Sequence, residues 1–255
     1  MAIVSQVIGI DIGSVGAKGV LFDGSIAASA IVPTGWDMKE TSRSLLSSLA
    51  GGKDVTALPL VATGYGRNAV EGARRTMTEI TCHARGVRFL HGEARTVLDI
   101  GGQDSKVIGL DRSGKVVDFA MNDRCAAGTG RFLQMMAHRL DYSLDDVKAL
   151  SCDGEVQPLT SMCAVFAETE VVAHIARGVP REALLRGILR AIAARAAAMV
   201  TKTGLTEPLF FSGGLSRIGS LATLIGRELK TEVAVHGRSP LAGAIGAALI
   251  AWEER

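Results

Sequence analysis

The stretch VIGIDIGSVGAKGVLFD (residues 7–23) reads as an apolar strand, a turn built on Asp-Ile-Gly, and a second strand. TVLDIGGQDSKVIGLD (residues 96–111) repeats this order with Asp-Ile-Gly-Gly at the turn. Each copy ends at a further turn, residues 23–24 and 111–114, that would lead into another hairpin strand. Two such copies predict an α/β protein with two similar lobes, each a parallel-containing sheet flanked by helices.

The remaining segments supply further strands and helices to both expected lobes. We expect a first lobe over residues 1–94, joined by the closing helix within 240–255, and a second lobe over 95–239 that carries the cysteines of interest. Apolar periodicity and turn residues predict strands at 58–62, 208–212 and 231–236, and helices at 78–86, 126–140, 164–177, 181–203, 216–229 and 240–252.

The composition excludes several classes of protein. Of 255 residues, 47% are hydrophobic and 21% are charged. The net charge of +2 does not indicate a strongly basic surface of the kind that binds nucleic acid. Asp11 interrupts the first apolar run, and the Ala-rich stretch 191–200 is too short to span a bilayer. We therefore expect a cytoplasmic protein without a membrane segment, whose four cysteines are reduced thiols or metal ligands rather than disulfides.

A carboxylate at a strand end, followed by Gly-Ser or Gly-Gly, suits a turn that binds nucleotide phosphates. Glycines let backbone N–H groups face the phosphates, while Ser14 and Lys18 add a donor and a charge. Asp11, Asp99 and Asp104 would hold Mg²⁺, which prefers carboxylate, water and phosphate oxygens. The alternative is that each Asp-Ile-Gly only makes a tight turn. The chain has neither a Walker A sequence nor G-x-G-x-x-G.

The order strand–DIGS–strand, strand–DIGG–strand, strand–SGG–helix resembles the actin, Hsp70 and sugar-kinase superfamily of two-lobed ATPases. The resemblance implies two actin-like lobes with a nucleotide cleft between them. It also implies that the two Asp-Ile-Gly turns bind the phosphates of the nucleotide. By the same resemblance, Gly213 and Gly214 lie against the adenosine, and Glu79 lies near the attacking water. Glu79 would otherwise be an exposed helix charge. The nucleotide-binding candidates are Asp11, Gly13, Ser14, Lys18, Gly101, Gly102, Gln103, Asp104, Gly213 and Gly214, and the catalytic candidates are Glu79 and Gln103.

Two cysteines precede predicted helices. Cys125 in NDRCAAGTGRF and Cys163 in TSMCAVFAETE would each benefit from the partial positive charge of a helix N-terminus, which stabilises a thiolate. Two thiols do not complete a four-thiolate site, but two from each of two identical chains would. Such a site suits zinc or an iron–sulfur cluster, and spacing alone does not separate them. The alternative is two buried small residues.

DIGGQDSK and NDRCAAGTGRF, with TEITCHARG before and TSMCAVFAETE after, resemble the ATP-dependent activators of 2-hydroxyacyl-CoA dehydratases, of the BadF/BadG/BcrA/BcrD type. The resemblance implies a homodimer with one bridging 4Fe-4S cluster held by Cys125 and Cys163 of each subunit. It implies that ATP hydrolysis, with ADP as product and Mg²⁺ as cofactor, drives one low-potential electron into the dehydratase. Ferredoxin or flavodoxin would be the electron donor.

Several alternatives stay open. The rivals to a dehydratase activator are the ATPase subunit of a benzoyl-CoA reductase, an activator of another double-cubane iron–sulfur protein, an amino-sugar kinase, for which no motif supplies a catalytic base, and a zinc-bound structural dimer. Cys82 and His83 are adjacent on one predicted helix and therefore point in different directions, so we expect helix packing. Cys152 is expected in a loop. The arginines expected on a solvated helix face are Arg181, Arg186, Arg190 and Arg195.

Overall fold

The computed structural model describes residues 6–51, 54, 57–161 and 163–255. The chain forms two compact units. The first unit comprises Met1–Ala94, Leu110–Val117 and Arg238–Arg255, and the second comprises Arg95–Gly109 and Asp118–Gly237. Two five-stranded sheets and the helices around them make this a mixed α/β protein.

The sheet of the first unit has the strand order β3-β2-β1-β4-β5. β1 runs antiparallel to β2 and parallel to β4, so the first Asp-Ile-Gly turn connects two paired strands as predicted. The turn at residues 23–24 leads into β3, which confirms the expected additional strand. The strands are β1 (Val7–Ile12), β2 (Gly16–Phe22), β3 (Ile26–Pro33), β4 (Leu60–Thr63) and β5 (Arg75–Thr76).

The second sheet repeats this arrangement, with the order β10-β9-β6-β7-β8. β6 is antiparallel to β7 and parallel to β9, as β1 is to β2 and β4. The strand predicted at residues 231–236 is only two residues long. The strands are β6 (Thr96–Ile100), β7 (Ser105–Leu110), β8 (Val116–Asn122), β9 (Leu209–Ser212) and β10 (Val233–Ala234).

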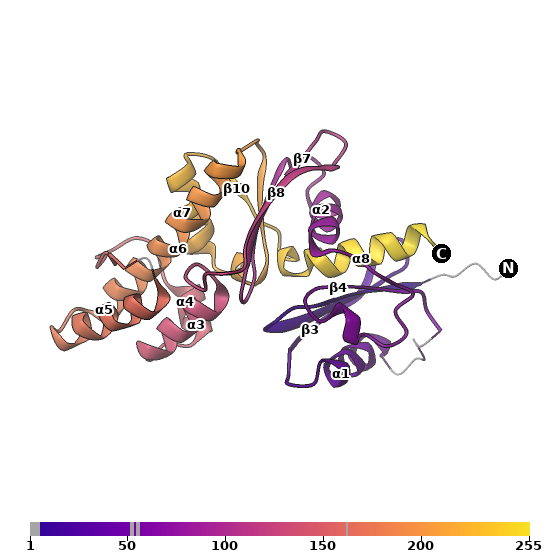
Figure 1. Cartoon of the computed structure of the whole chain (residues 1–255), viewed down its shortest axis with the longest axis horizontal. Coiled ribbons are helices and arrows are strands. Elements are labelled where there is room, and N and C mark those ends of the chain that lie inside the picture. Colours follow the sequence, from indigo (N-terminus) through magenta and orange to yellow (C-terminus); the bar gives the residue numbers. More distant parts are fainter. Residues whose placement is uncertain (1–5, 52–53, 55–56, 162) are drawn as a thin grey trace. The chain divides into compact units, whose positions relative to one another are not determined.

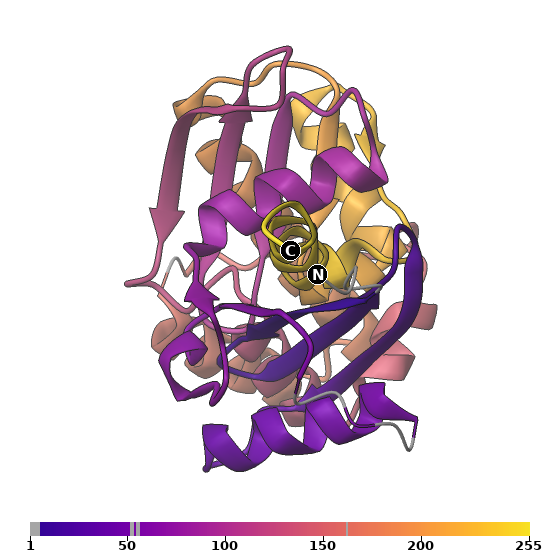
Figure 2. The ribbon, with the colours of Figure 1, turned by 90° about the vertical axis from the view of Figure 1, so that its right-hand side faces the viewer.

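Helices cover both faces of the first sheet, which explains why β1 is buried along its whole length. α1 (Met38–Ala50) packs on one face, against alternate residues Ile8, Ile10 and Ile12 of β1. On the opposite face, α8 (Ala242–Glu253) lies beside α2 (Glu79–Leu90), as Figures 1 and 2 show. Two short 3₁₀ helices complete the unit, at Arg67–Ala69 and Ser239–Leu241.

Glycines let α2, α8 and β1 approach one another closely. A Cβ on Gly86 of α2 would lie 1.8 Å from the carbonyl oxygen of Ala242, and one on Gly246 of α8 would lie 1.8 Å from that of Cys82. A Cβ on Gly9 of β1 would meet the carbonyl oxygen of Ala244 at 2.1 Å. Because real Cβ atoms do not tolerate such distances, only glycine permits this packing.

In the second unit one large apolar core joins the sheet to helices α3, α6 and α7. Leu98, Val107 and Phe211 are its contributions from three neighbouring strands. α6 spans the predicted residues, and α5 begins at the predicted residue. The helices are α3 (Gly130–Arg139), α4 (Leu144–Ala149), α5 (Ala164–Ala176), α6 (Arg181–Thr203) and α7 (Gly219–Leu229).

α3 begins later than the sequence predicted, at Gly130 rather than at residue 126. Gly128 has φ of 116°, outside the helical region, and Thr129 is the N-cap with an extended backbone. The Thr129 hydroxyl donates to the carbonyl oxygen of Ala126 at 2.6 Å, which stabilises a turn in place of a helix. Likewise, a 3₁₀ turn at Gly214–Arg217 precedes α7, which starts at Gly219.

No helix within the described ranges is both long and apolar enough to cross a lipid bilayer.

Candidate functional site

Each Asp-Ile-Gly turn carries an aspartate paired with a lysine across its hairpin. In the first unit Asp11 faces Lys18 in the strand register, and Lys18 Nζ lies 3.3 Å from Asp11 Oδ2. In the second unit Asp99 faces Lys106, with Nζ 3.6 Å from Asp99 Oδ2. Lys106 was not among the predicted site residues. Its position seven residues after the aspartate, in both copies of the repeat, is the signal that identifies it.

The strand parallel to each aspartate adds a hydroxyl and a glycine. Thr63 lies beside Asp11 and Ser212 beside Asp99, and the Ser212 hydroxyl donates to Asp99 Oδ1 at 2.9 Å. The next residues, Gly64 and Gly213, have φ of 92° and 83°. A Cβ on Gly64 would lie 2.5 Å from Asp11 Oδ1, and one on Gly213 would lie 2.3 Å from the carbonyl oxygen of Ile100. Glycine is therefore required twice, for backbone conformation and for space.

The turn of the first unit is held by a backbone hydrogen bond within the turn and by the side chain of Thr34. The Gly13 amide donates to the carbonyl oxygen of Gly16 at 3.2 Å, and the Thr34 hydroxyl donates to that of Gly13 at 2.7 Å. Asp11 is buried, whereas Ser14 and Lys18 are half-buried. A buried carboxylate beside a lysine and partly exposed donors is a suitable arrangement for phosphate and Mg²⁺.

The turn of the second unit is linked to helix α3. The Gly101 amide donates to the carbonyl oxygen of Asp104 at 2.9 Å, which closes the turn. The Gly130 amide donates to the Gly101 carbonyl oxygen at 2.9 Å, and the Arg131 amide to that of Gly102 at 2.8 Å. The first two amides of α3 are thereby satisfied by the candidate phosphate turn itself.

The carboxylates of the second unit differ in their accessibility. Asp99 is buried, with Ser212 at one oxygen and Lys106 near the other. Asp104 is more exposed, and its Oδ2 lies 2.6 Å from Lys106 Nζ. Asp104 is therefore more accessible to a ligand than Asp99, and Lys106 lies nearer to Asp104 than to Asp99. Gln103, which lies between Asp99 and Asp104 in the sequence, is exposed to solvent.

Helix α2 carries Glu79, Cys82 and His83. Glu79 is its first residue and is half-buried. His83 is buried, and a Cβ on Gly243 would meet both its Nε2, at 3.0 Å, and Asp11 Oδ2, at 2.7 Å. His83 and Asp11 therefore converge at the start of α8. Burial raises the pKa of the Cys82 thiol to about 12, so Cys82 is a neutral packing residue, as expected.

The two candidate metal ligands are exposed thiols of the second unit. Cys163 is the N-cap of α5, which confirms that it stands at a helix N-terminus. Cys125 does not, because it lies in the loop between β8 and α3, four residues before the N-cap Thr129. A hydrogen bond from β7 holds the loop that contains Cys125. The Ser105 hydroxyl donates to the carbonyl oxygen of Gly128 at 3.3 Å.

The segment before Cys163 is anchored by Glu170 of α5. Glu170 Oε1 accepts from the Thr160 amide at 2.8 Å, and Oε2 accepts from the Ser161 amide at 2.9 Å. Burial raises the pKa of the Glu170 carboxyl, but the hydrogen bonds from Thr160 and Ser161 outweigh it and lower that pKa to about 2. The carboxylate is therefore charged at neutral pH and holds the backbone of Thr160 and Ser161.

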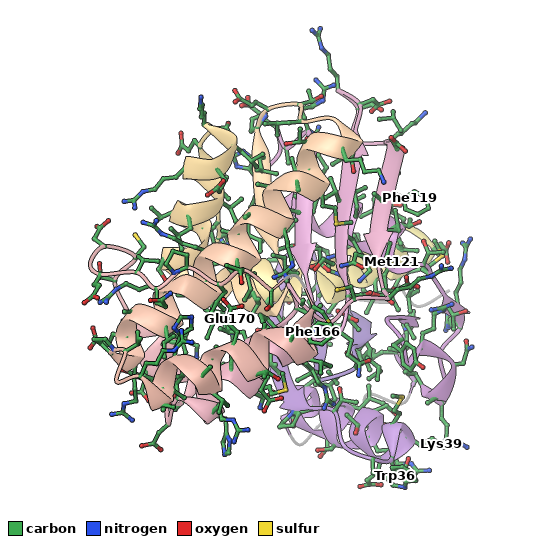
Figure 3. All side chains as sticks on the ribbon, turned by 60° about the vertical axis from the view of Figure 1, so that its left-hand side comes forward. Trp36, Lys39, Phe119, Met121, Phe166 and Glu170 are labelled. Carbon is green, nitrogen blue, oxygen red and sulfur yellow. The ribbon has the colours of Figure 1, made fainter. Side chains whose placement is uncertain are left out.

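Apolar side chains are exposed on elements that adjoin both thiols. Figure 3 labels Phe166 and Glu170 on α5, and Phe119 and Met121 on β8. Val165 and Phe166, directly after Cys163, are each 68% exposed. Val172 and Ile175 continue the exposed apolar surface along α5. An apolar helix left this exposed is typical of a surface that associates with another protein chain.

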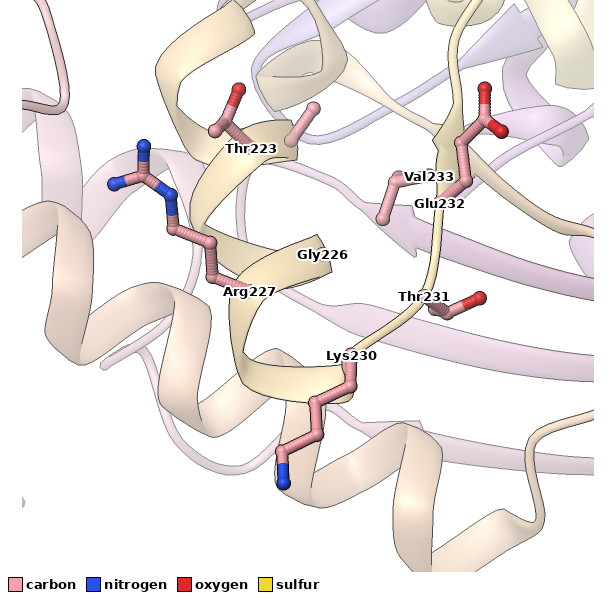
Figure 4. A pocket seen from close by; sticks show the side chains of 8 residues that line it. Thr223, Gly226, Arg227, Lys230, Thr231, Glu232 and Val233 are labelled. Atoms are coloured by element: carbon pink, nitrogen blue, oxygen red, sulfur yellow. The ribbon is translucent and has the colours of Figure 1, made fainter.

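The described residues contain no group of three or more His, Cys, Asp or Glu side chains that could hold a metal ion. Cys125 and Cys163 are two soft, exposed donors on one unit, which fits half of a tetrathiolate site completed by a second copy of the chain. A shallow pocket of about 520 Å³ between α7 and β10, shown in Figure 4, shares no residue with the predicted sites.

Comparison with known proteins gives a family match and several similar relatives. The sequence profile of the BadF/BadG/BcrA/BcrD ATPase family matches residues 8–251. The activator of lactoyl-CoA dehydratase from Anaerotignum propionicum is 39% identical over 251 residues, which cover 96% of this chain and 97% of that protein. A benzoyl-CoA reductase subunit from Thauera aromatica is 38% identical over 177 residues, which cover 67% of this chain and 63% of that protein.

The structural comparison agrees with the sequence comparison. The activator of the 2-hydroxyisocaproyl-CoA dehydratase from Clostridium difficile, solved with bound ADPNP, matches with a TM-score of 0.93 at 38% identity. The match covers 98% of this chain and 95% of that one. The predicted fold class, α/β with two similar actin-like lobes, is thereby confirmed.

Proposed function

The chain belongs to the BadF/BadG/BcrA/BcrD ATPase family, and we propose that it is an ATP-dependent one-electron donor that activates a partner iron–sulfur enzyme. The partner we propose is a 2-hydroxyacyl-CoA dehydratase, because the activator of lactoyl-CoA dehydratase is similar along nearly its whole length. The family resemblance inferred from the Asp-Ile-Gly and cysteine motifs is confirmed by these matches.

We assign nucleotide binding to the two Asp-Ile-Gly turns. Asp11, with Gly13, Ser14 and Lys18, serves in the first unit, and the turn 101–104 serves in the second, with Gly213 and Gly214 at the adenosine. The paired Asp–Lys arrangement in both units supports this assignment, since each places a cation and a carboxylate at a glycine turn. We add Lys106 to the set. Asp11, Asp99 and Asp104 would hold Mg²⁺.

Glu79 and Gln103 remain our candidates for positioning the attacking water. Glu79 is half-buried on α2, the helix that also carries His83 toward Asp11, and this supports a role near the phosphates. Gln103 is exposed in the turn of the second unit, where its amide is accessible to a ligand. Replacing either residue by alanine should lower the rate of ATP hydrolysis more than the affinity for ATP.

We propose that Cys125 and Cys163 of each protomer together hold one 4Fe-4S cluster on the twofold axis of a homodimer. Two exposed thiols per chain and the exposed apolar surface of α5 support this arrangement. When bound, the cluster would supply one-electron redox chemistry that no amino-acid side chain offers at low potential. The chain's own contribution is to hold the thiols, through Glu170 and the loops, and to bury the apolar face against its copy.

The observation that carries the proposal is the backbone connection between the turn 101–104 and α3. Gly130 and Arg131 bind the carbonyl oxygens of Gly101 and Gly102, and Cys125 lies in the loop that leads into the same helix. A change in the turn on ATP hydrolysis would therefore move the start of α3 and the Cys125 loop together. Coupling between phosphate chemistry and a distant element commonly takes this form.

The remaining parts of the proposal concern partners and location. Ferredoxin or flavodoxin would reduce the protein, and the exchange would take place in the cytoplasm. A second function stays open, namely the ATPase component of a benzoyl-CoA reductase, because the Thauera aromatica protein is 38% identical over 177 residues. The smaller coverage of that match favours the stand-alone activator.

The proposal is tested by electron transfer in the absence of oxygen. The chemically reduced protein is mixed with a purified 2-hydroxyacyl-CoA dehydratase in the presence of ATP, ADP or the non-hydrolysable ADPNP, and dehydration is followed. We expect activation with ATP and none with ADP or ADPNP. ATP hydrolysis that depends on a sugar and yields a sugar phosphate would instead establish a kinase. Bound zinc with negligible ATP hydrolysis would establish a structural dimer.

A further inference from the structure

Arg195 on α6 does not lie on a solvated helix face, contrary to the sequence prediction. The side chain is half-buried, and its Nη2 donates to the carbonyl oxygen of Ser161 at 3.3 Å. Its Cδ lies 3.5 Å from the position of a Cβ on Gly128. One arginine thus hydrogen-bonds to the segment before Cys163 and lies next to the loop after Cys125.

The hydrogen bond to Ser161 places the guanidinium two residues before Cys163 in the chain. Burial lowers the pKa of Arg195, and the nearby Cys125 and Cys163 side chains partly oppose that shift. An arginine stays protonated throughout the pH range in which proteins fold. Its positive charge is therefore a fixed property of the surroundings of Cys125 and Cys163.

Arg195 and Glu170 hold opposite sides of one peptide segment. Glu170 accepts from the amides of Thr160 and Ser161, while Arg195 donates to the Ser161 carbonyl oxygen. Residues 160 and 161 are therefore held from α5 and from α6 together. The Cys125 loop is held by the Ser105 hydroxyl, which donates to the Gly128 carbonyl oxygen, and the Arg195 stem lies next to Gly128.

We propose that Arg195 is a positioning residue for the metal centre, which holds both cysteine loops and places a fixed positive charge beside their thiolates. The inference rests on the proposed function, because Cys125 and Cys163 are taken as the metal ligands. A positive charge near a centre of thiolate ligands stabilises its more negative, reduced form, and so raises its reduction potential. Residues that orient metal ligands in this way commonly affect metal retention.

Arg190 provides a matched control. It lies on the same helix, five residues before Arg195, and is exposed. Three variants separate charge from geometry. Arg195→Met keeps much of the apolar stem and removes the charge. Arg195→Lys keeps a positive charge but lacks the planar guanidinium group. Arg190→Met removes a charge from the exposed surface of the same helix.

The measurements are the reduction potential by dye-mediated titration with electron spin resonance, and the rate at which a chelator removes iron. For Arg195→Met we expect a more negative potential and iron loss about tenfold faster than in wild type. For Arg195→Lys we expect a potential near wild type but faster iron loss. Arg190→Met should match wild type in both measurements.

A wild-type potential together with wild-type iron loss in Arg195→Met would overturn the inference. If circular dichroism shows that Arg195→Met does not fold, Arg195→Lys tests the positioning role in its place. A wild-type rate of iron loss in Arg195→Lys would overturn that role. A wild-type protein that binds no iron would contradict the proposed function instead. In metal-free protein, amide hydrogen exchange over residues 125–129 and 157–161 should still be faster in the Arg195 variants, and unchanged exchange there would overturn the inference independently.

Discussion

The backbone amide of Gly130 donates a 2.9 Å hydrogen bond to the carbonyl oxygen of Gly101, which ties the first residue of α3 to the turn between β6 and β7. Arg131 repeats the contact with Gly102 at 2.8 Å. Both turn and helix belong to the second unit, and the Cys125 loop runs directly into that helix. The candidate phosphate turn and the candidate metal loop are therefore mechanically connected through main-chain bonds.

Replacing Gly130 by alanine should weaken this connection. The added Cβ would lie 3.1 Å from the Gly101 carbonyl oxygen and 3.4 Å from the Gly102 Cα, so the helix start must move away from the turn by a few tenths of an ångström. We expect the difference in chelator access to iron between the ATP-bound and ADP-bound protein to fall severalfold in Gly130→Ala. The difference is measured by iron release followed spectroscopically under anaerobic conditions.

Gly219 gives the matched control for this prediction, because it is also the first residue of a helix. A Cβ there would meet no atom within 4 Å, so Gly219→Ala should keep the nucleotide effect and be unchanged or slightly more stable. Equal nucleotide effects in Gly130→Ala and wild type would show that the contact between α3 and the turn does not transmit the change.

Replacing Gly86 by alanine should destabilise the first unit strongly. The Cβ would lie 1.8 Å from the Ala242 carbonyl oxygen, so α2 and α8 must separate, at a cost of about 3 kcal/mol in the free energy of unfolding. Urea unfolding followed by circular dichroism measures this value. Gly92→Ala, whose Cβ would be 3.9 Å from its nearest neighbour, should change it by less than about 1 kcal/mol. Similar values for the two variants would contradict the close packing of α2 on α8.

Glu170 should make stability depend on acid pH. Its pKa in the folded state, about 2, is below the usual 4.5 because hydrogen bonds from the Thr160 and Ser161 amides outweigh burial. A carboxyl with a depressed pKa stabilises the fold above its unfolded pKa, and this stabilisation is lost as pH falls from 4.5 toward 2. The difference in unfolding free energy between wild type and Glu170→Gln should therefore narrow over that window.

The control for this experiment is Glu168→Gln, which removes a neighbouring carboxylate that pairs with Arg139 rather than with loop amides. Urea unfolding of all three proteins is compared at intervals from about pH 6 to about pH 2. A difference between wild type and Glu170→Gln that stays constant over the whole range would show that the loop amides do not depress the Glu170 pKa.

The hairpins could be predicted because their signals are local. Apolar runs on both sides of Asp-Ile-Gly specify two strands and a turn, and the repeat of this pattern predicts two similar sheets. The start of α3 could not be found in this way. Its apolar spacing extends back past Gly130, but the positive φ of Gly128 and the hydrogen bond from Thr129 to Ala126 end the helix at Gly130.

Two functional candidates were missed for different reasons. Lys106 was visible in the sequence, since it occupies the position of Lys18 in the second copy of the repeat. Arg195 was not, because helical spacing places it with other arginines, and its contacts with Ser161 and Gly128 are fixed by tertiary packing. Long-range contacts of this kind have no signature in local sequence.

The most direct test of the central claim is the metal content of the protein purified without oxygen. Iron, acid-labile sulfide and zinc are measured per dimer in wild type, Cys125→Ala, Cys163→Ala and the control Cys152→Ala. We predict about four iron and four sulfide per dimer in wild type and Cys152→Ala, and loss of both from the Cys125 and Cys163 variants. Zinc alone, or ATP hydrolysis by a protein that binds no metal, would contradict an electron-donating activator.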